Sequence, residues 1–238
     1  MNNRILSVLL NKLVKNKETV LSLKTGIVTY INPFAYLKIR NKLNIDGFDL
    51  ITSDGVVIKI LYRLFFGKNV ERLSPDFSSY FSDLFHSIED DKSTIYFIGT
   101  KPSLISKSIT NIKNKYPNLN IVGYRNGYFN GNEEVDANIN EVVELNPEVV
   151  VVGMGTPMQE QYLIDLKNKG WKGRGFACGG FLHQTAFKTV YYPKWVNKYN
   201  LRWLYRIYRE PKLFKRYTID YAWFLILFLI DFFKFKKR

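Results

Sequence analysis

A carboxylate that directly follows a predicted strand is the first candidate for chemistry in this chain. Residues 49–52 (DLIT) have the composition of a short buried strand, and Ser53, Asp54 and Gly55 come next, where a helix is expected to begin. The N-terminus of a helix favours negative charge, and an ionised carboxylate that faces a cleft can accept a proton from a hydroxyl group. Asp54 is therefore a candidate general base, with a simple helix cap as the alternative interpretation.

Two glycine-rich turns follow two other predicted strands. The first occupies residues 153–160 (GMGTPMQE), and the second comprises Gly179 and Gly180 and is followed by His183. Glycine lets a backbone approach a ligand closely, and the free N–H groups of a helix that starts at Pro157 can hold an anion. The first turn is neither a P-loop nor a G-x-G-x-x-G fingerprint. His183 either contacts a ligand or is held by hydrogen bonds inside the protein.

Asn32 comes directly after the predicted strand at residues 26–31, and Pro33 then fits the first turn of a helix. Asn32 is therefore either the cap of that helix or a ligand contact. A metal site is not expected, because the chain contains two His and one Cys and no Asp-x-Asp follows a strand. Cys178 is interpreted as a packing residue. The sequence predicts neither a metal nor a cofactor.

These candidate residues share one position, the carboxyl ends of alternating strands. Strands are predicted at residues 26–31, 49–52, 94–99, 120–123, 148–154 and 173–178, and helices at residues 33–42, 55–66, 77–88, 102–115, 132–145 and 159–169. Such alternation implies an α/β fold with a mostly parallel sheet and helices on both faces. Ligands of these folds bind beyond the carboxyl ends of the strands, where Asp54 and the glycine-rich turns are expected.

The positive charge is concentrated toward the C-terminal end. The chain of 238 residues carries a net charge of +14, and residues 188–238 contain 13 Lys and Arg against three acidic residues, a net charge of +10. With 46% hydrophobic and 24% charged residues, the composition excludes wholesale disorder. A single Cys fits a reducing compartment. A near-neutral body with a basic end indicates an anionic partner: a membrane, a phosphorylated substrate or nucleic acid.

The same region contains ten consecutive apolar residues, 221–230 (YAWFLILFLI), followed by a cluster of Lys and Arg. This run is shorter than the about 20 apolar residues of a spanning helix. It is typical of a helix that lies in the membrane interface, and a core helix is the alternative. The change in character predicts an α/β body at residues 1–187 and a basic, aromatic helical appendage at residues 188–238. No nucleic-acid-binding motif is present, so nucleic acid is not the expected partner.

The candidate residues also occur in the order found in one protein family. The chain resembles the WecG/TagA/CpsF glycosyltransferases over about residues 25–217. The matching residues are Asn32, Asp54-Gly55, Glu71-Arg72, Gly127-Tyr128-Phe129, Gly153, Gly155, Pro157, Gln159-Glu160, Gly179-Gly180, Leu201, Trp203-Leu204-Tyr205-Arg206, Glu210-Pro211 and Arg216-Tyr217. No single element is decisive, but all of them in this order at family-like spacing are specific.

The resemblance implies a compact Rossmann-like fold and an inverting, metal-independent glycosyl transfer. It implies a UDP-sugar as donor and, as acceptor, a saccharide on a polyprenyl diphosphate at the cytoplasmic face of the cell membrane, to which the appendage binds peripherally. Asp54 then corresponds to the catalytic base and Arg72 to an active-site arginine, while Arg206 and Arg216 neutralise the diphosphate leaving group. The residues expected to bind substrate are Asn32, Gly127, Tyr128, Gly153, Gly155, Gln159, Glu160, Gly179, Gly180 and His183.

Four positions depart from the family pattern, namely Tyr30 in place of a Thr, His183 in place of an acidic residue, Leu213 in place of an Arg, and Arg202 in place of a Glu. These departures leave the identity of the donor sugar undecided. The expected function is a glycosyltransferase of capsule or exopolysaccharide synthesis, with a UDP-N-acetylmannosamine transferase of teichoic acid synthesis as the alternative. A non-catalytic membrane-surface partner of another transferase is disfavoured by the presence of Asp54, Gln159 and Arg206. A homo-oligomer is also consistent with the resemblance.

Overall fold

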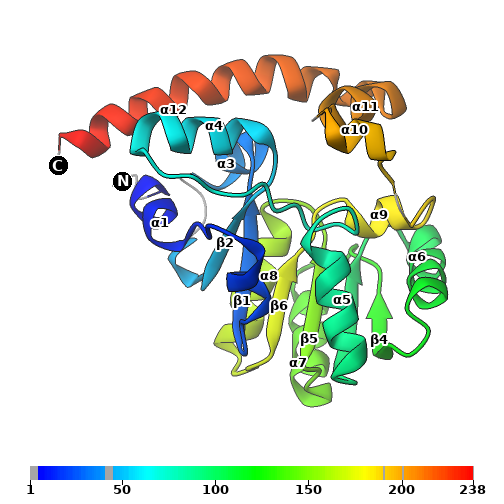
Figure 1. Ribbon diagram of the computed structural model, residues 1–238. Coiled ribbons are helices and arrows are strands. Elements are labelled where there is room, and N and C mark those ends of the chain that lie inside the picture. The colour runs from blue at the N-terminus through cyan, green and yellow to red at the C-terminus, as the bar shows by residue number, and fades with distance from the viewer. Residues whose placement is uncertain (1–4, 41–44, 190, 200, 238) are drawn as a thin grey trace.

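The computed structural model describes residues 5–40, 45–189, 191–199 and 201–237. Over these residues the chain forms one six-stranded sheet in the order β2-β1-β6-β5-β3-β4, with every neighbouring pair of strands parallel (Figure 1). The strands are β1 (Gly26–Ile31), β2 (Leu50–Ser53), β3 (Thr94–Gly99), β4 (Asn120–Arg125), β5 (Val149–Gly153) and β6 (Arg174–Ala177). The predicted α/β class and parallel sheet are confirmed.

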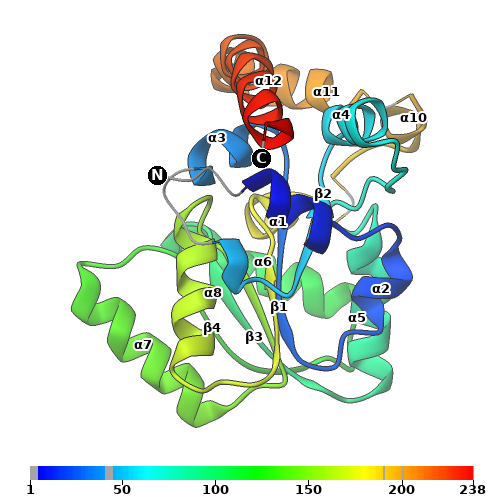
Figure 2. The same cartoon turned by 90° about the vertical axis from the view of Figure 1, so that its left-hand side faces the viewer.

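Helices cover both faces of this sheet, and its central strand is apolar as a result. β5 (VVVVG) is buried along its whole length, which is typical of a parallel strand between two helical layers. The helices α7 (Asn132–Leu145) and α8 (Met158–Asn168) pack into one buried cluster, and α5 (Tyr80–Asp90) and α6 (Pro102–Lys115) pack into the other (Figure 2). The carboxyl ends of the strands are left free for a site.

The helix boundaries differ from the predicted ones where side chains close local turns. The predicted helix at residues 77–88 begins only at Tyr80 as α5, because Asp76 Oδ1 accepts hydrogen bonds from Ser78 N (2.8 Å) and Ser78 Oγ (2.6 Å) and holds these residues in a turn. The predicted helix at residues 33–42 is α3 (Pro33–Ile39), and residues 41–44 lie outside the described part of the chain. The short helices α1 (Ile5–Lys12) and α2 (Lys17–Leu21) were not predicted.

The long C-terminal helix α12 (Tyr221–Lys236) lies across α3 and α4 (Val56–Phe66), at the top of Figure 1. Its Phe224, Phe228 and Phe232 are buried. Edge-to-face ring contacts hold them, with centroids 5.1 Å apart for Tyr36 and Phe224 and 4.7 Å apart for Phe65 and Phe232. One face of the apolar run at residues 221–230 therefore packs on the body, as the core-helix alternative predicts.

A buried ion pair fixes the position of α12 along α3. The Asp231 carboxylate, 3% exposed, accepts hydrogen bonds from Tyr36 Oη (2.6 Å) and Arg40 Nε (2.9 Å), and a second guanidinium nitrogen of Arg40 completes the pair. A buried carboxylate is tolerated only with such partners. The pairing therefore fixes how α12 sits on the helix that follows β1.

The rest of the C-terminal segment forms a short helical arch above the sheet, at the upper right of Figure 1. It comprises α10 (Lys194–Lys198), α11 (Arg202–Arg209) and the turns at Pro211–Leu213 and Arg216–Asp220, and it follows α9 (Phe181–Thr185). In the part of the chain that the structure describes, no helix is long and apolar enough to cross a bilayer.

Candidate active site

A cavity of about 690 Å³ lies between the carboxyl ends of the strands and the C-terminal arch. Its lining comes from the segments that follow β1 to β6, from α9, and from residues 192–221. Twelve of the predicted site residues line it: Asn32, Asp54, Arg72, Gly127, Tyr128, Gly153, Gly155, Gly179, Gly180, His183, Arg206 and Arg216. The tertiary structure thus brings together residues that are far apart in the sequence.

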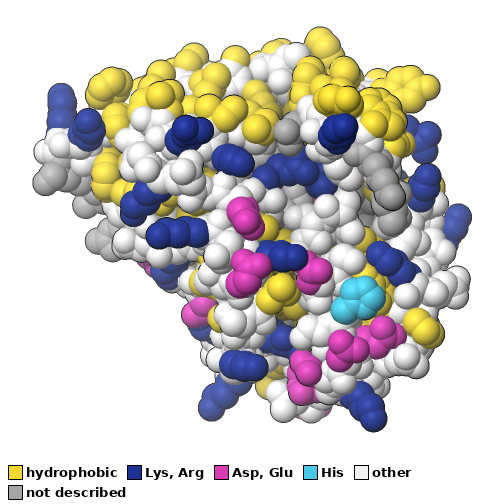
Figure 3. All heavy atoms as spheres, viewed as in Figure 1, with side chains coloured by type: hydrophobic (Ala, Val, Ile, Leu, Met, Phe, Trp, Pro, Cys, Tyr) yellow, Lys and Arg dark blue, Asp and Glu magenta, His cyan; other side chains and the backbone are white. Residues whose placement is uncertain are grey.

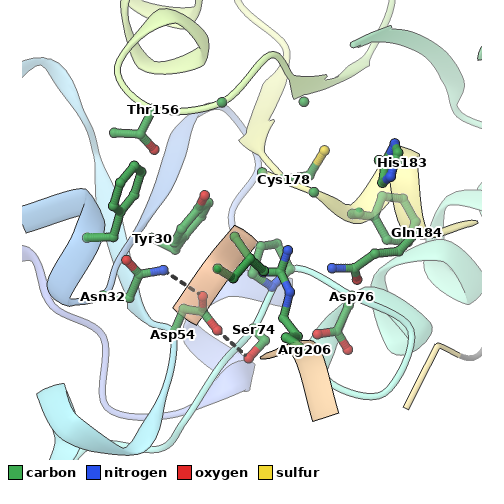
Figure 4. A pocket seen from close by; sticks show the side chains of 18 of the residues that line it. Tyr30, Asn32, Asp54, Ser74, Asp76, Thr156, Cys178, His183, Gln184 and Arg206 are labelled. Carbon is green, nitrogen blue, oxygen red and sulfur yellow. Dashed lines mark hydrogen bonds between the residues drawn. The ribbon is translucent and has the colours of Figure 1, made fainter. Parts of the chain in front are cut away.

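The Asp54 carboxylate is held at the wall of the cavity by two hydrogen bonds (Figure 4). Asn32 Nδ2 donates to Asp54 Oδ2 over 2.9 Å, and Ser74 Oγ donates to Asp54 Oδ1 over 2.7 Å. Each oxygen keeps a further acceptor site, because an ionised carboxylate accepts about four hydrogen bonds. The group is oriented and still able to accept a proton.

Local backbone structure explains why Asp54 is placed there. Its N–H donates to Ile31 O over 2.9 Å, which extends the pairing of β1 with β2 by one residue. Gly55 then adopts a positive φ of 94° and caps α4, a conformation that favours glycine. The chain therefore turns sharply after Asp54 and leaves the carboxylate at the strand end.

Asn32 is the cap of α3, which is one of the two roles that the sequence left open. Its Oδ1 accepts a 2.8 Å hydrogen bond from Ala35 N and so caps α3. Its Nδ2 is directed at Asp54 instead of at solvent. Asn32 thus fixes the start of α3 relative to the carboxylate, and it lines the cavity as well.

The two glycine-rich turns form the opposite wall, and a buried glutamine joins them. Gln159 Oε1 accepts a 3.0 Å hydrogen bond from Gly179 N, and Gln159 Nε2 donates to Thr156 Oγ1 over 3.3 Å. Gly179 has a φ of 55°, and a Cβ there would overlap the phenol oxygen of Tyr30. Glycine at this position lets the turn lie directly against Tyr30.

Gln159 and Glu160 lie behind the cavity wall, so the prediction that they contact substrate directly is wrong. They are 0% and 1% exposed. Glu160 Oε1 accepts hydrogen bonds from Gln159 Nε2 (2.8 Å) and Thr29 Oγ1 (3.0 Å). Burial raises the pKa of Glu160 above its ordinary value, and these hydrogen bonds act in the opposite direction. The first turn of α8 faces the core at these residues, so they shape the wall that a ligand meets.

Arginines from two separate segments face the cavity. Arg72 comes from the loop after α4, where burial, and then the charge of Arg202, lower its pKa. Arg206 and Arg216 come from the C-terminal arch, and the guanidinium of Arg216 lies 3.8 Å from the centre of the Phe34 ring. The buried Nε atoms of Arg206 and Arg216 have no hydrogen-bond partner among the residues described. Guanidinium groups with donors to spare suit a diphosphate.

The end of the cavity beyond β3 and β4 carries the other predicted contacts. Tyr128 is 60% exposed there, in the loop that follows β4. His183 lies on α9, where burial lowers the pKa of its imidazole below the ordinary value; Lys212 and Lys101 act in the same direction and Glu210 opposes them. The His183 ring also packs edge-to-face against Phe187, with centroids 5.3 Å apart. The charge around His183 at this end is thus mainly basic.

Ser74 and Tyr30 are among the lining residues that were not predicted as site residues. Ser74 lies in an irregular loop, so no periodicity marks it. Tyr30 carries a signal, because it is the second residue before Asn32 and the backbone of Asn32 is still extended, so alternation places both side chains on the same face. Burial, followed by the charges of Glu160 and Asp54, raises the pKa of Tyr30, so its phenol stays protonated.

The arrangement is suited to transferring a group from an anionic leaving group to a hydroxyl. One carboxylate is held in a fixed orientation, and cations stand where negative charge would develop, which is the main source of stabilisation in such transfers. No group of three His, Cys, Asp or Glu side chains within the described residues is placed to hold a metal ion. The described residues of the site offer a carboxylate, two glycine-rich turns and arginines.

Comparison with known proteins agrees with this geometry. Residues 2–238 match the family described as glycosyl transferase WecG/TagA/CpsF. The chain is 35% identical, over 93% of its length and 91% of the relative's, to a UDP-Gal:alpha-D-GlcNAc-diphosphoundecaprenol beta-1,4-galactosyltransferase of Shigella boydii. It is 26% identical, over 80% of its length and 74% of the relative's, to an N-acetylglucosaminyldiphosphoundecaprenol N-acetyl-beta-D-mannosaminyltransferase of Bacillus subtilis.

Proposed function

This chain belongs to the WecG/TagA/CpsF family of glycosyltransferases, and from this premise we propose that it transfers a sugar from a UDP-sugar to a saccharide linked to a polyprenyl diphosphate. The proposed acceptor is N-acetylglucosaminyl-diphosphoundecaprenol, because both relatives are named for activity on it. Galactose is the first candidate for the transferred sugar, since the galactosyltransferase matches almost the whole chain. The product would belong to capsule or exopolysaccharide synthesis.

The observation that carries this proposal is that Asp54, held by two hydrogen bonds, and the arginines line one cavity. In the proposed step, the acceptor hydroxyl oxygen attacks the anomeric carbon and its proton passes to Asp54. The bond from that carbon to the diphosphate oxygen breaks, and UDP leaves with the electron pair. Arg206 and Arg216 neutralise the charge on the departing diphosphate, with Arg72 in the glycosyl pocket. Attack from the face opposite the leaving group inverts the anomeric configuration.

The cations on the leaving group are supplied by the protein in this proposal, so the transfer is metal-independent and uses no cofactor. Arg72, Arg206 and Arg216 are among the arginines that line the cavity, and a guanidinium is charged at every physiological pH. The glycine-rich turns at Gly153, Gly155, Gly179 and Gly180 would contact the donor with their backbone. Gln159 supports this contact from behind, because it joins the two turns.

An exposed apolar face next to the cavity fits the lipid on which the acceptor is carried. It consists of Ile60 and Leu64 of α4, Trp203, Leu204 and Tyr208 of α11, and Trp223, Leu225, Ile226, Leu229, Ile230 and Phe233 of α12, all at least 40% exposed. Hydrophobic side chains cover the top of the molecule, with Lys and Arg side chains below them (Figure 3). Such a surface is typical of a protein bound to an anionic membrane. We propose peripheral binding at the cytoplasmic face of the membrane.

The second candidate donor is UDP-N-acetylmannosamine, the alternative that the sequence left open. The relatives from Bacillus subtilis and Bacillus spizizenii are both named N-acetyl-beta-D-mannosaminyltransferases, but they match 80% and 71% of this chain at 26% and 23% identity. The lower identity and coverage place this donor behind galactose.

A turnover assay with a panel of donors tests the proposal. The purified chain is incubated with N-acetylglucosaminyl-diphosphoprenol and with UDP-galactose, UDP-glucose, UDP-N-acetylglucosamine or UDP-N-acetylmannosamine, and the lipid product is identified by mass. We expect one hexose added from UDP-galactose, with inverted anomeric configuration by NMR and with an unchanged rate in EDTA. Turnover only with UDP-N-acetylmannosamine would select the alternative donor, a rate lost in EDTA would reject metal independence, and no turnover with any donor would reject the proposal.

A further inference from the structure

The loop at residues 72–79 joins the C-terminal arch to the catalytic carboxylate through side chains. We propose that the ion pair between Arg202 and Asp76 couples the arch to Asp54, by holding the turn from which Ser74 orients the carboxylate. Arg202, Asp76 and Ser74 are positioning residues in this proposal, and none of them reacts. The inference rests on the proposed function, because it takes Asp54 as the base.

All three guanidinium nitrogens of Arg202 of α11 donate hydrogen bonds, two of them to the loop and one to α10. Its Nη1 donates to Asp76 Oδ2 over 2.7 Å, its Nη2 to Ser78 Oγ over 3.1 Å, and its Nε to Asn197 Oδ1 over 2.6 Å. The guanidinium also stacks on Tyr192, 4.6 Å from the ring centre. Arg202 therefore has a different role from Arg206 and Arg216, whose Nε atoms lack such partners.

The ion pair is shielded enough to be structurally significant. The side chains of Arg202 and Asp76 are 12% and 14% exposed, whereas both partners of the Lys17–Asp83 pair are more than 40% exposed. Exposed pairs contribute little to stability, but breaking a buried pair leaves a desolvated charge behind. Loss of one partner is therefore expected to displace the loop.

The turn transmits such a displacement to Ser74. Asp76 N donates to Ser74 O over 2.9 Å, and Ser74 N donates to Ser79 Oγ over 3.1 Å. Asp76 Oδ1 is itself bonded to Ser78, so one carboxylate ties the arch to the turn. Ser74 and Asp76 consequently move together.

The Ser74 hydroxyl has few hydrogen-bond partners available other than Asp54. It is 2% exposed, so water does not replace the carboxylate as its partner, and its Oγ donates to Asp54 Oδ1 over 2.7 Å. Together with the bond from Asn32, this contact sets the plane of the carboxylate. A misplacement of about 1 Å at a reacting group can reduce the rate by about 10²-fold. The loop thus links docking of the arch to the geometry of the base.

A double-mutant cycle on Ser74→Ala and Arg202→Gln tests this coupling in the full-length chain. We expect each single variant to lower kcat by about 10- to 100-fold, with the KM for the UDP-sugar within about threefold of wild type. We expect the double variant to lose no more than the worse single variant, because both changes act on one orientation. Ser74→Thr, which keeps the hydroxyl, should recover most of kcat. Lys17→Ala, which breaks the exposed Lys17–Asp83 pair, serves as the matched control with unchanged kcat.

Independent losses that multiply in the double variant would overturn the coupling, and so would an unchanged kcat in Arg202→Gln. If Arg202→Gln fails to fold, Asp76→Asn breaks the same pair from the other side and replaces it in the cycle. Amide hydrogen exchange of residues 72–79 is the second readout and needs no turnover. We expect faster exchange in Arg202→Gln than in Lys17→Ala. If the wild-type chain shows no transferase activity, the proposed function is rejected. The hydrogen-exchange result would still decide whether the arch holds the loop.

Discussion

Asn32 and Asp54 are joined by a 2.9 Å hydrogen bond from the amide of Asn32 to the carboxylate of Asp54. The same amide group also accepts a hydrogen bond from Ala35 N and so caps α3. One side chain therefore both fixes the start of a helix and orients the proposed base. Tyr36 of α3 and Arg40, which caps the C-terminal end of α3, hold Asp231 of α12. The packing of the C-terminal helix and the orientation of the proposed base are therefore built on the same short helix.

Replacing Asp54 by Asn is expected to abolish transfer while leaving donor binding intact. The amide has the shape of the carboxylate but cannot accept the proton of the acceptor hydroxyl, so kcat should fall by about 10²- to 10⁴-fold. UDP binding, measured by calorimetry, should stay within about threefold of wild type. Turnover at the wild-type rate would remove the assigned role of Asp54.

Two substitutions of Asn32 separate its structural role from its role at the carboxylate. Asn32→Ser keeps a side-chain cap and loses the donor to Asp54, whereas Asn32→Ala loses both. We expect kcat to fall in both variants, but Tm to fall only in Asn32→Ala, by about 2–4 °C for the about 1 kcal/mol that a cap contributes. Thermal unfolding and turnover of the two variants distinguish these effects. A normal kcat in Asn32→Ser would show that the bond to Asp54 is dispensable.

The exposed apolar face is expected to hold the chain on anionic membranes. Trp223 and Phe233 lie on the outer side of α12, 54% and 61% exposed, so Trp223→Ser and Phe233→Ser should leave the fold intact. Burying an aromatic side chain in lipid contributes about 1.5–3 kcal/mol, so each change should weaken co-sedimentation with anionic phospholipid vesicles about tenfold or more. Tyr124→Ser, at a 45% exposed position on β4, is the control. Equal sedimentation of all three variants would show that α12 does not contact the lipid.

Glu160 is expected to make stability depend on pH. Burial raises the pKa of Glu160 above its ordinary value of 4.5, so above pH 4.5 the folded chain binds more protons at this residue than the unfolded chain. The free energy of unfolding therefore loses a contribution as pH rises toward the raised pKa. Glu160→Gln keeps the accepting Oε1 and cannot ionise, so the variant should gain stability relative to wild type as pH increases. Urea unfolding of both proteins from pH 4.5 to pH 8 measures this difference, and parallel curves would contradict it.

Much of the body was predictable from local patterns. The strand at residues 26–31 and the helices at residues 102–115 and 132–145 match the structure residue for residue, because Val- and Ile-rich runs between turn residues specify strands locally. Asp54 and the glycine-rich turns were predicted for a related reason, since strand ends are visible in the sequence. The burial of Gln159 and Glu160 could not be predicted from the sequence, because burial of one helix face depends on what packs against it.

The sequence by itself determined the alternating strands and helices, the family, and which residue types stand at the strand ends, because each of these depends on neighbours in the chain or on order and spacing. Only the tertiary structure decided that Arg202 meets Asp76 across 126 residues and that Tyr36 meets Asp231 across 195 residues. Such contacts have no local signature, since they arise when separate elements bury apolar faces against one another and charged side chains must then find partners. The division of α12 into a packed face and an exposed face was decided in the same way, by the positions of α3 and α4 beneath it.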